Sequence, residues 1–265
     1  MGAQLLGMRQ VAKPWGRRLL PPPFANRGTD PVGEIWFAES GATPLPLLAK
    51  YLFTSEKLSV QVHPNDAQAR ARGAASGKEE CWLVLDAAPG AVLGIGTTRP
   101  LSAQELRAAS LDGSIEGLMD WKPVRRGDFF YIPAGTVHAI GAGIALIEVQ
   151  QHADITFRLY DYGRPRELHL DDGVAVAQAR PYADPRAAHV DFAADRLLVD
   201  GPLFRVAIGG PAMRLHGSGP ALVLPLVGHA SAHGETARPG DCLAVDADSD
   251  WQGSADARLL IARMV

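Results

Sequence analysis

Short apolar runs, separated by glycine, proline and polar residues, recur along the chain and predict many short β-strands. Before residue 176 the runs are GEIWFAES (33–40), the stretch 47–64, ECWLVLDA (80–87), GDFFYIPAG, GIALIEVQQ and DITFRLYDY. Beyond residue 196 four more follow at short intervals, namely LFRVAI, ALVLPLV, DCLAVDA and RLLIARMV. Most of residues 1–50 has no clear period and is expected to be irregular. The pattern therefore predicts a mainly β protein.

One region has a helical signature. Residues 102–121 begin with Ser102 followed three positions later by Glu105, which is a capping box. Gly113 interrupts the region and is expected to divide it into two short helices. Residues 65–78 are small, polar and charged, and are expected to form a loop that can include a helical turn.

The strand runs fall into two groups on either side of a polar, alanine- and proline-rich stretch at 176–196. A similar turn opens a strand in each group: Gly127-Asp128 leads to His138, and Gly240-Asp241 leads to Trp251 at the same spacing. An indole cannot bind a metal ion, so a second module related to the first would have no site of its own. Coincidence between two Gly-Asp turns is nearly as good an explanation.

Composition and charge narrow the possible partners. A formal net charge of −3 gives no general attraction to nucleic acid or to an anionic membrane, so any phosphate must be recognised by a local basic pocket. The only cysteines, Cys81 and Cys242, exclude a disulfide framework. No apolar run reaches membrane-span length, and the first residues do not have the order of a secretory signal. We therefore expect a cytoplasmic protein, of undetermined oligomeric state.

Ser59, Gln61 and His63 occupy alternate positions of one predicted strand, so their side chains share a face. Leu58, Val60 and Val62 would occupy the other face. A polar face of this kind can line a cavity, but taken alone it is more typical of a strand exposed to solvent.

A second motif favours the cavity. The spacing Gly127-x5-Pro133-x-Gly135-x2-His138 resembles the second half of the cupin signature, although Ala142 replaces its usual closing asparagine. This resemblance implies a jelly-roll β-barrel in which the histidine projects inward and joins ligands from an earlier strand. His63 and Glu80, together with Gln61, are available there. Two imidazoles and two oxygens suit Zn²⁺ or another divalent ion, and a neutral amide ligand leaves the metal a stronger electrophile.

Several blocks together resemble a known family. KPWG, GEIWFAES, LSVQVHPND, GKEECW, GDFFYIPAGTVHAIGAG and IEVQQHADITFRLYDYGR are similar to the type I phosphomannose isomerases in their short bacterial form. The resemblance spans residues 13 to about 175. It implies a metal-binding catalytic cupin domain at 1–175 with a helical insertion near 102–121. A linker at 176–196 and a smaller, degenerate cupin-like module at 197–265 would follow.

The resemblance also implies roles for individual residues. It implies four zinc ligands, one Zn²⁺ per chain, namely Gln61, His63, Glu80 and His138. It implies catalytic roles for Arg158, Glu148 and Lys78, and places Ser59, Lys78 and Arg158 toward the sugar phosphate. The expected reaction is the metal-dependent interconversion of mannose 6-phosphate and fructose 6-phosphate through an enediolate, in which Glu148 or Lys78 moves the proton.

Structural explanations for these residues remain open from the sequence. Arg158 could pair with Asp161 or Asp154, Glu148 could be a surface residue at a strand end, and Lys78 could be a solvated loop lysine. Glu79 and Gly163 depart from the family's usual Thr and Asp. Glu79 is expected to add negative charge beside the path of the phosphate.

Two other functions fit the same motifs. An iron-dependent cupin oxygenase would use a similar pocket, although Gln61 in place of a histidine argues mildly against it. A non-catalytic sugar-phosphate-binding cupin is the other alternative, and it predicts the loss of a proton-transfer residue.

Overall fold

The computed structural model describes residues 2–38 and 45–265, and most of its regular structure is β-strand, as predicted. The predicted strand at 33–40 is observed as β3 (Val32–Ala38), and its last two residues lie outside the described part.

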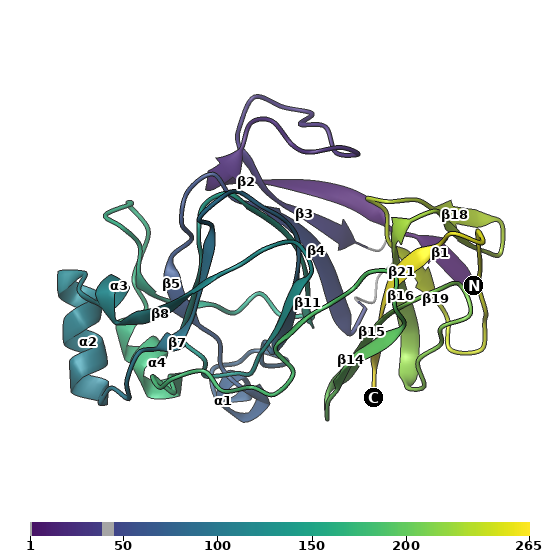
Figure 1. Ribbon diagram of the computed structural model, residues 1–265. Helices are drawn as coiled ribbons and strands as arrows, with labels where there is room; N and C mark the ends of the chain where they lie inside the picture. Colours follow the sequence, from purple (N-terminus) through teal and green to yellow (C-terminus); the bar gives the residue numbers. More distant parts are fainter. Residues whose placement is uncertain (1, 39–44) are drawn as a thin grey trace.

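Two antiparallel sheets face each other and form a barrel around a buried core (Figure 1). The seven-stranded sheet has the order β13 (Ala188–His189), β9 (Asp128–Ile132), β6 (Glu80–Ala87), β11 (Ile144–Gln151), β4 (Leu47–Phe53), β3 and β2 (Gly7–Arg17). The five-stranded sheet has the order β12 (Phe157–Tyr160), β5 (Val60–Val62), β10 (His138–Ile140), β7 (Val92–Thr97) and β8 (Met119–Pro123). Trp82 and Leu146 of the first sheet pack with Leu93 and Ile140 of the second.

The C-terminal strands form a second β unit, at the right of Figure 1. Its six-stranded sheet has the order β1 (Ala3–Leu5), β19 (Leu243–Val245), β16 (Ser218–Val227), β21 (Arg258–Met264), β15 (Phe204–Gly209) and β14 (Arg196–Asp200). A small sheet contains β18 (Glu235–Ala237), β17 (Ala230–Ala232) and β20 (Gln252–Gly253). Because β1 pairs with β19, the first residues of the chain lie in the sheet built by its last ones.

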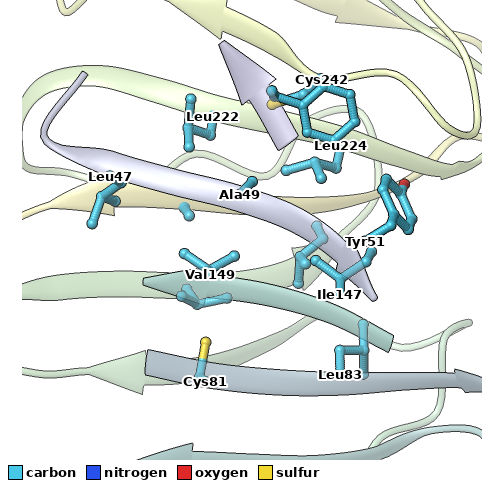
Figure 2. Close-up of a cluster of buried hydrophobic side chains, with 14 of the residues drawn as sticks. Leu47, Ala49, Tyr51, Cys81, Leu83, Ile147, Val149, Leu222, Leu224 and Cys242 are labelled. Carbon is cyan, nitrogen blue, oxygen red and sulfur yellow. The ribbon is translucent and has the colours of Figure 1, made fainter. Parts of the chain in front are cut away.

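A shared apolar core joins the two units. Figure 2 shows Leu47, Ala49 and Tyr51 of β4 facing Leu222, Leu224 and Cys242 of the C-terminal sheet. The ring of Phe204 packs 5.7 Å, centroid to centroid, from that of Tyr131 on β9. The outer face of the seven-stranded sheet is therefore covered by protein, and the burial of these apolar side chains stabilises the contact between the units.

The helices are short and lie at the side and base of the barrel. They are α1 (Asp66–Arg70), α2 (Ala103–Asp112), α3 (Ile115–Leu118) and α4 (Leu170–Val176). The capping box of Ser102 and Glu105 is present, and Gly113 ends α2 in the left-handed conformation, as predicted. The loop at 65–78 contains the helical turn α1.

The structure corrects the prediction in three places. Strand β2 lies in the N-terminal region that was expected to be irregular; as the edge strand of its sheet it is largely exposed and contains Pro14, so it has no apolar alternation to detect. Trp121, assigned to the helical region, belongs to β8. Helix α4 was missed because Gly173 interrupts it and no side chain caps its start.

The stretch 176–196 packs against the barrel. Its short strand β13 pairs with β9, and the hydroxyl of Tyr182 donates to the backbone oxygen of Tyr131 at 2.7 Å. The domain boundaries at 175 and 197 stay a prediction. The structure adds only that the stretch between them contacts the first unit over much of its length.

The two Gly-Asp turns have the same local structure. Asp128 accepts a hydrogen bond from the backbone N–H of Arg125, and Asp241 accepts one from that of Arg238, each at 2.9 Å. Gly127 and Gly240 both have positive φ. At the later position, Trp251 is buried in the apolar core of the second unit. The two turns therefore have similar local structure. Trp251, which follows the second turn at the spacing at which His138 follows the first, is a core residue.

Candidate metal centre

Three buried side chains from three strands converge inside the barrel: His63 just after β5, Glu80 at the start of β6, and His138 at the start of β10. One candidate ligand atom from each lies within 4.8 Å of the others. The Nε2 atom of His63 is 3.4 Å from Oε2 of Glu80, and that of His138 is 3.6 Å from Oε1. The structure thus brings together three of the four expected ligands, although they are far apart in sequence.

Backbone carbonyls orient both imidazoles. Nδ1 of His63 lies 3.0 Å from the oxygen of Ile155, and Nδ1 of His138 lies 2.8 Å from that of Thr136. Because a carbonyl can only accept, each Nδ1 carries the proton and each Nε2 is an acceptor. The Nε2 atom of His63 accepts a hydrogen bond from the Lys78 ammonium at 3.2 Å, and that of His138 faces Glu80. Burial lowers the pKa of His138 to about 4 and that of His63 well below its usual value. Both imidazoles are therefore neutral near pH 7, the form that binds metals.

Glu80 completes a donor set that fits a divalent cation. Its Oε1 atom is buried and has no hydrogen-bond partner among the described residues. Burial, reinforced by the charge of Glu148, raises its pKa to about 7. An unpartnered carboxylate oxygen that faces the neutral imidazole nitrogen of His138 is costly to bury, and a bound cation would satisfy it.

Gln61 lies at the edge of this group. In the sheet it is directly opposite His138 on one side and Arg158 on the other. Its Nε2 atom is 3.2 Å from Nε2 of His138, while its Oε1 accepts a hydrogen bond from Ser59 at 3.1 Å. Ligation by the amide oxygen would need the opposite amide orientation, which exchanges O and N without moving the chain.

A pocket of about 130 Å³ is lined by Gln61 and Lys78, which contact His138 and Glu80 respectively. Its lining is lysine- and arginine-rich and consists of Lys13, Trp15, Glu34, Trp36, Lys50, Leu52, Leu58, Ser59, Gln61, Lys78, Ile140, Glu148, Asp154, Thr156, Arg158 and Arg166. All of the predicted catalytic and substrate-binding residues are in this lining. The polar strand face therefore lines a cavity, and the solvent-exposed alternative does not hold.

A buried charge network connects the pocket to Glu80. The Lys78 ammonium hydrogen-bonds to Glu80 and lies 3.7 Å from Glu148. Lys50 lies 3.2 Å from Glu148, and the indole N–H of Trp82 donates to Glu148 at 3.1 Å. Lys78 and Glu148 are each 5% exposed, so neither is a solvated surface residue.

The same contacts set the charges of this network. Burial would raise the pKa of Glu148, but Lys78 and Lys50 outweigh it and lower that pKa to about 2. Burial would lower the pKa of Lys78, but Glu148 and Glu80 outweigh it and raise that pKa. Near pH 7 the pair is therefore carboxylate and ammonium.

Sequence reasoning missed Lys50. It lies within the uniformly buried strand β4, directly opposite Glu148 on β11. Its ammonium also lies 4.5 Å from the ring centre of Trp36. The sequence did contain a signal for Lys50, because it is a lysine within an apolar run typical of a buried strand. A buried charge needs a partner of opposite charge, so such a lysine indicates an ion pair inside the protein.

Arg158 does not form the ion pair with Asp161 or Asp154 that the sequence left open. One of its terminal nitrogens donates to the backbone oxygen of Glu167 at 2.6 Å, and among the described residues no carboxylate lies within ion-pair distance of it. Asp161 pairs instead with Arg166 and Arg164. The guanidinium of Arg158 is thus available to the pocket.

Glu79 points away from this pocket, which corrects the expectation that it lies beside the path of the phosphate. Its carboxylate accepts a hydrogen bond from the hydroxyl of Tyr131 and lines a separate groove with Asn65 and Arg180. The reason is strand alternation: Lys78 and Glu80 face the barrel interior, so Glu79 between them faces outward.

The other histidines do not form a second centre in the described part of the chain. His152, His189, His216, His229 and His233 are exposed, as expected. His169 is half-buried, and its Nδ1 accepts a hydrogen bond from the backbone N–H of Arg158.

No protein-family model matches the chain. It is 37% identical over 190 residues to a mannose-6-phosphate isomerase of Streptococcus mutans, and 37% identical over 179 residues to mannose-6-phosphate isomerase ManA of Bacillus subtilis. These matches cover 66% and 63% of this chain, and 60% and 56% of the relatives, so the matched part spans less than two thirds of either relative.

Solved structures share the fold. The crystal structure of mannose 6-phosphate isomerase from Bacillus subtilis superposes with a TM-score of 0.80 over 99% of both chains, at 23% identity. A zinc-bound mannose 6-phosphate isomerase gives a TM-score of 0.71 over 99% of both chains, at 17% identity. No helix in the described residues is both long and apolar enough to cross a membrane. The chain is therefore similar in sequence to mannose-6-phosphate isomerases over about two thirds of its own length, and it shares the fold of solved structures of that name.

Proposed function

We propose that the protein interconverts mannose 6-phosphate and fructose 6-phosphate, with one Zn²⁺ held by His63, Glu80 and His138 and by Gln61 after its amide turns. The observation that carries this proposal is the buried His-Glu-His group beside a pocket that contains Lys78, Glu148 and Arg158. The 37% identity to mannose-6-phosphate isomerases supports the choice of reaction.

The residues suggest a division of roles in the reaction. A bound divalent ion would polarise the substrate's carbonyl edge and stabilise negative charge on oxygen. Glu148 is ionised and is assigned the transfer of the proton between C1 and C2. Lys78 is protonated near pH 7, so it cannot accept that proton and instead holds Glu148 and Glu80 in place. Arg158 supplies permanent positive charge toward the enediolate.

Three further assignments belong to the same proposal. Ser59 orients Gln61 through its hydroxyl and contacts the sugar. The catalytic unit is residues 1–175, and the module at 197–265 supports it without a metal site. The protein acts in the cytoplasm on a small sugar phosphate, without nucleic acid or membrane as a partner.

Chelation tests the function. The purified protein, as isolated and after chelation, is assayed for fructose 6-phosphate formed from mannose 6-phosphate, with oxygen consumption recorded in parallel. We expect turnover that disappears on chelation, returns with Zn²⁺ and consumes no oxygen. Oxygen uptake with iron would identify an oxygenase instead, and substrate binding without turnover would identify a non-catalytic binding protein.

Two variants separate metal binding from chemistry. His138→Ala removes one of two imidazole donors, so zinc content and activity should both be lost. Arg158→Ala should keep zinc and lower kcat on the order of 100-fold, the typical cost of one group that stabilises developing negative charge. Zinc is measured by metal analysis of protein purified without added metal. Normal turnover of Arg158→Ala would contradict the role of Arg158.

A further inference from the structure

Gln150 on β11 is a fully buried polar residue beside the candidate metal centre. It lies directly opposite Glu80 on β6, and two positions after Glu148 on its own strand. Because side chains alternate along a strand, Gln150 shares the inner face of the barrel with both carboxylates. Side chains that lie directly opposite on neighbouring strands have Cβ atoms about 5 Å apart, so Gln150 is a direct neighbour of a candidate ligand.

The amide nitrogen of Gln150 holds the turn that follows β11. Its Nε2 atom donates to the backbone oxygens of Gln151 and Ala153, each at 2.8 Å. Both amide protons are used in these two contacts, and exchanging O and N would set an acceptor against two acceptors. The contacts of Gln150 therefore determine the orientation of its amide.

The same turn leads to the carbonyl that orients His63. Two residues after Ala153, the backbone oxygen of Ile155 lies 3.0 Å from Nδ1 of His63. The segment 151–155 is thus held by Gln150 at one end and contacts a candidate ligand at the other. A shift of the turn would move the acceptor on which the orientation of the His63 imidazole depends.

The next residue, Gln151, makes its contacts on the other side of the strand. Its Oε1 atom accepts a hydrogen bond from the backbone N–H of Glu79 at 3.0 Å, and its Nε2 donates to Asp66 at 2.9 Å. These contacts face away from the barrel interior, because Gln151 alternates with Gln150. Gln150 is therefore the residue of this pair that connects the turn to the interior.

The amide oxygen of Gln150 is an independent observation. Its Oε1 atom is buried and has no hydrogen-bond partner among the described residues, and the same holds for Oε1 of Glu80 on the neighbouring strand. A buried acceptor without a partner costs free energy. Two such oxygens on adjacent strands favour a cation or a hydrogen-bond donor close to both, which is the setting of a metal centre.

We infer that Gln150 is a positioning residue of the metal centre. Its amide nitrogen holds the turn whose Ile155 carbonyl orients His63, and its amide oxygen is a neutral acceptor beside Glu80. Removal of a group that orients a metal ligand typically lowers metal affinity about 10–100-fold. The inference rests on the proposed function for the presence of a divalent ion, but it does not depend on the reaction, and metal binding alone tests it.

The test measures the Zn²⁺ affinity of the full chain by competition with a chromophoric chelator. Gln150→Met keeps the length and unbranched shape of the side chain but removes the donors and the acceptor, so Zn²⁺ binding should weaken about 10–100-fold. Thr54→Val is the matched control near the other end of β11. Thr54 is also fully buried, donates to the backbone oxygen of Gly141 at 2.7 Å and accepts from the backbone N–H of Ile144 at 2.9 Å. Its replacement removes comparable contacts and should leave Zn²⁺ affinity unchanged.

A spectrum separates positioning from a loss of stability. Co²⁺ binds to the same kinds of ligand as Zn²⁺, and its visible absorption depends on the number and arrangement of its ligands. The Co²⁺-loaded Gln150→Met protein should differ from the wild type in band position and intensity, whereas Thr54→Val should reproduce the wild-type spectrum. If Gln150→Met does not fold, Gln150→Asn is measured in the same way, because its amide is one methylene shorter and cannot hold both carbonyls.

The outcomes separate this inference from the proposed function. Wild-type Zn²⁺ affinity and an unchanged Co²⁺ spectrum in a folded Gln150→Met protein would overturn the role of Gln150 and leave the proposed isomerase standing. An equal loss of affinity in Thr54→Val would also overturn it, since the effect would then be one of general stability. Zn²⁺ binding that depends on Gln150 in a protein without isomerase activity would keep the role of Gln150 and remove the proposed reaction.

Discussion

At the scale of single residues, the candidate site works through paired charges that are almost completely withdrawn from water. Glu148 is the centre of this arrangement, because Lys50, Lys78 and Trp82 all donate to it or lie within ion-pair distance. A buried carboxylate stays ionised only while such partners are present. The geometry that holds Glu148 for its proposed role therefore also contributes to the stability of the barrel.

Lys50→Met tests this coupling. Removing Lys50 leaves the buried negative charge of Glu148 with one fewer positive partner. The free energy of unfolding, measured by denaturant titration near pH 7, should therefore fall by about 3 kcal/mol. The pKa of Glu148 is lowered from 4.5 to about 2, so its stabilisation is complete above pH 4.5 and is lost as the pH falls toward 2. The difference between wild type and variant should therefore shrink on acidification. Lys50→Met/Glu148→Gln should recover most of the stability at pH 7, and no recovery would contradict the pairing.

At the scale of elements, short strands deliver the site residues and a helical insertion lies outside them. His63, Glu80 and His138 stand at or next to strand ends, where β5, β6 and β10 meet inside the barrel. Helices α2 and α3 pack on the outer face of the five-stranded sheet, and Leu106 and Ile115 are buried there with Val60 and Leu159. The insertion thus supports the back of the strands that carry Gln61 and Arg158.

Ser102→Ala tests how much the capping box contributes to this insertion. Ser102 accepts a hydrogen bond from the backbone N–H of Glu105 at 3.2 Å, and its loss should lower the free energy of unfolding by about 1 kcal/mol. Ser114→Ala is the matched control, because Ser114 begins α3 without a side-chain capping bond. Equal effects of the two substitutions in denaturant unfolding would show that the capping bond contributes nothing.

At the scale of the whole molecule, the two β units share one core. Residues of β4, β6, β9 and β11 pack against β15, β16, β19 and β21, and β1 joins the first residues of the chain to the C-terminal sheet. Because each unit covers apolar surface of the other, we expect them to unfold together.

Phe204→Ala tests this cooperativity. Phe204 is fully buried between the units, so truncation should lower the free energy of unfolding by about 3–5 kcal/mol. Leu197→Ala, at a position 47% exposed in the same sheet, should change it little. Tryptophan fluorescence and far-ultraviolet circular dichroism should give coincident transitions in wild type and variant. Two separate transitions in the wild type would show that the units are independent.

The sequence by itself determined the features that depend on local order. Alternation and turn residues located β6, β9 and β11, and the Ser102–Glu105 spacing located the start of α2. The Gly-Pro-Gly-His spacing and the family resemblance indicated which residues belong to the site. The exposed edge strand β2 and the glycine-containing helix α4 were not predicted. Neither has a clear periodic pattern of apolar residues, because each is stabilised by backbone pairing or by packing against other elements.

Only the tertiary structure decided how these pieces meet. It placed Lys50 opposite Glu148 and turned Glu79 away from the pocket. It also paired Asp161 with Arg166, so Asp161 is not the partner of Arg158. It also placed the first strand of the chain in the last sheet. Each of these depends on strand register and on competition among charged partners for a limited number of buried positions. Both are settled by contacts between residues far apart in sequence, which local pattern does not encode.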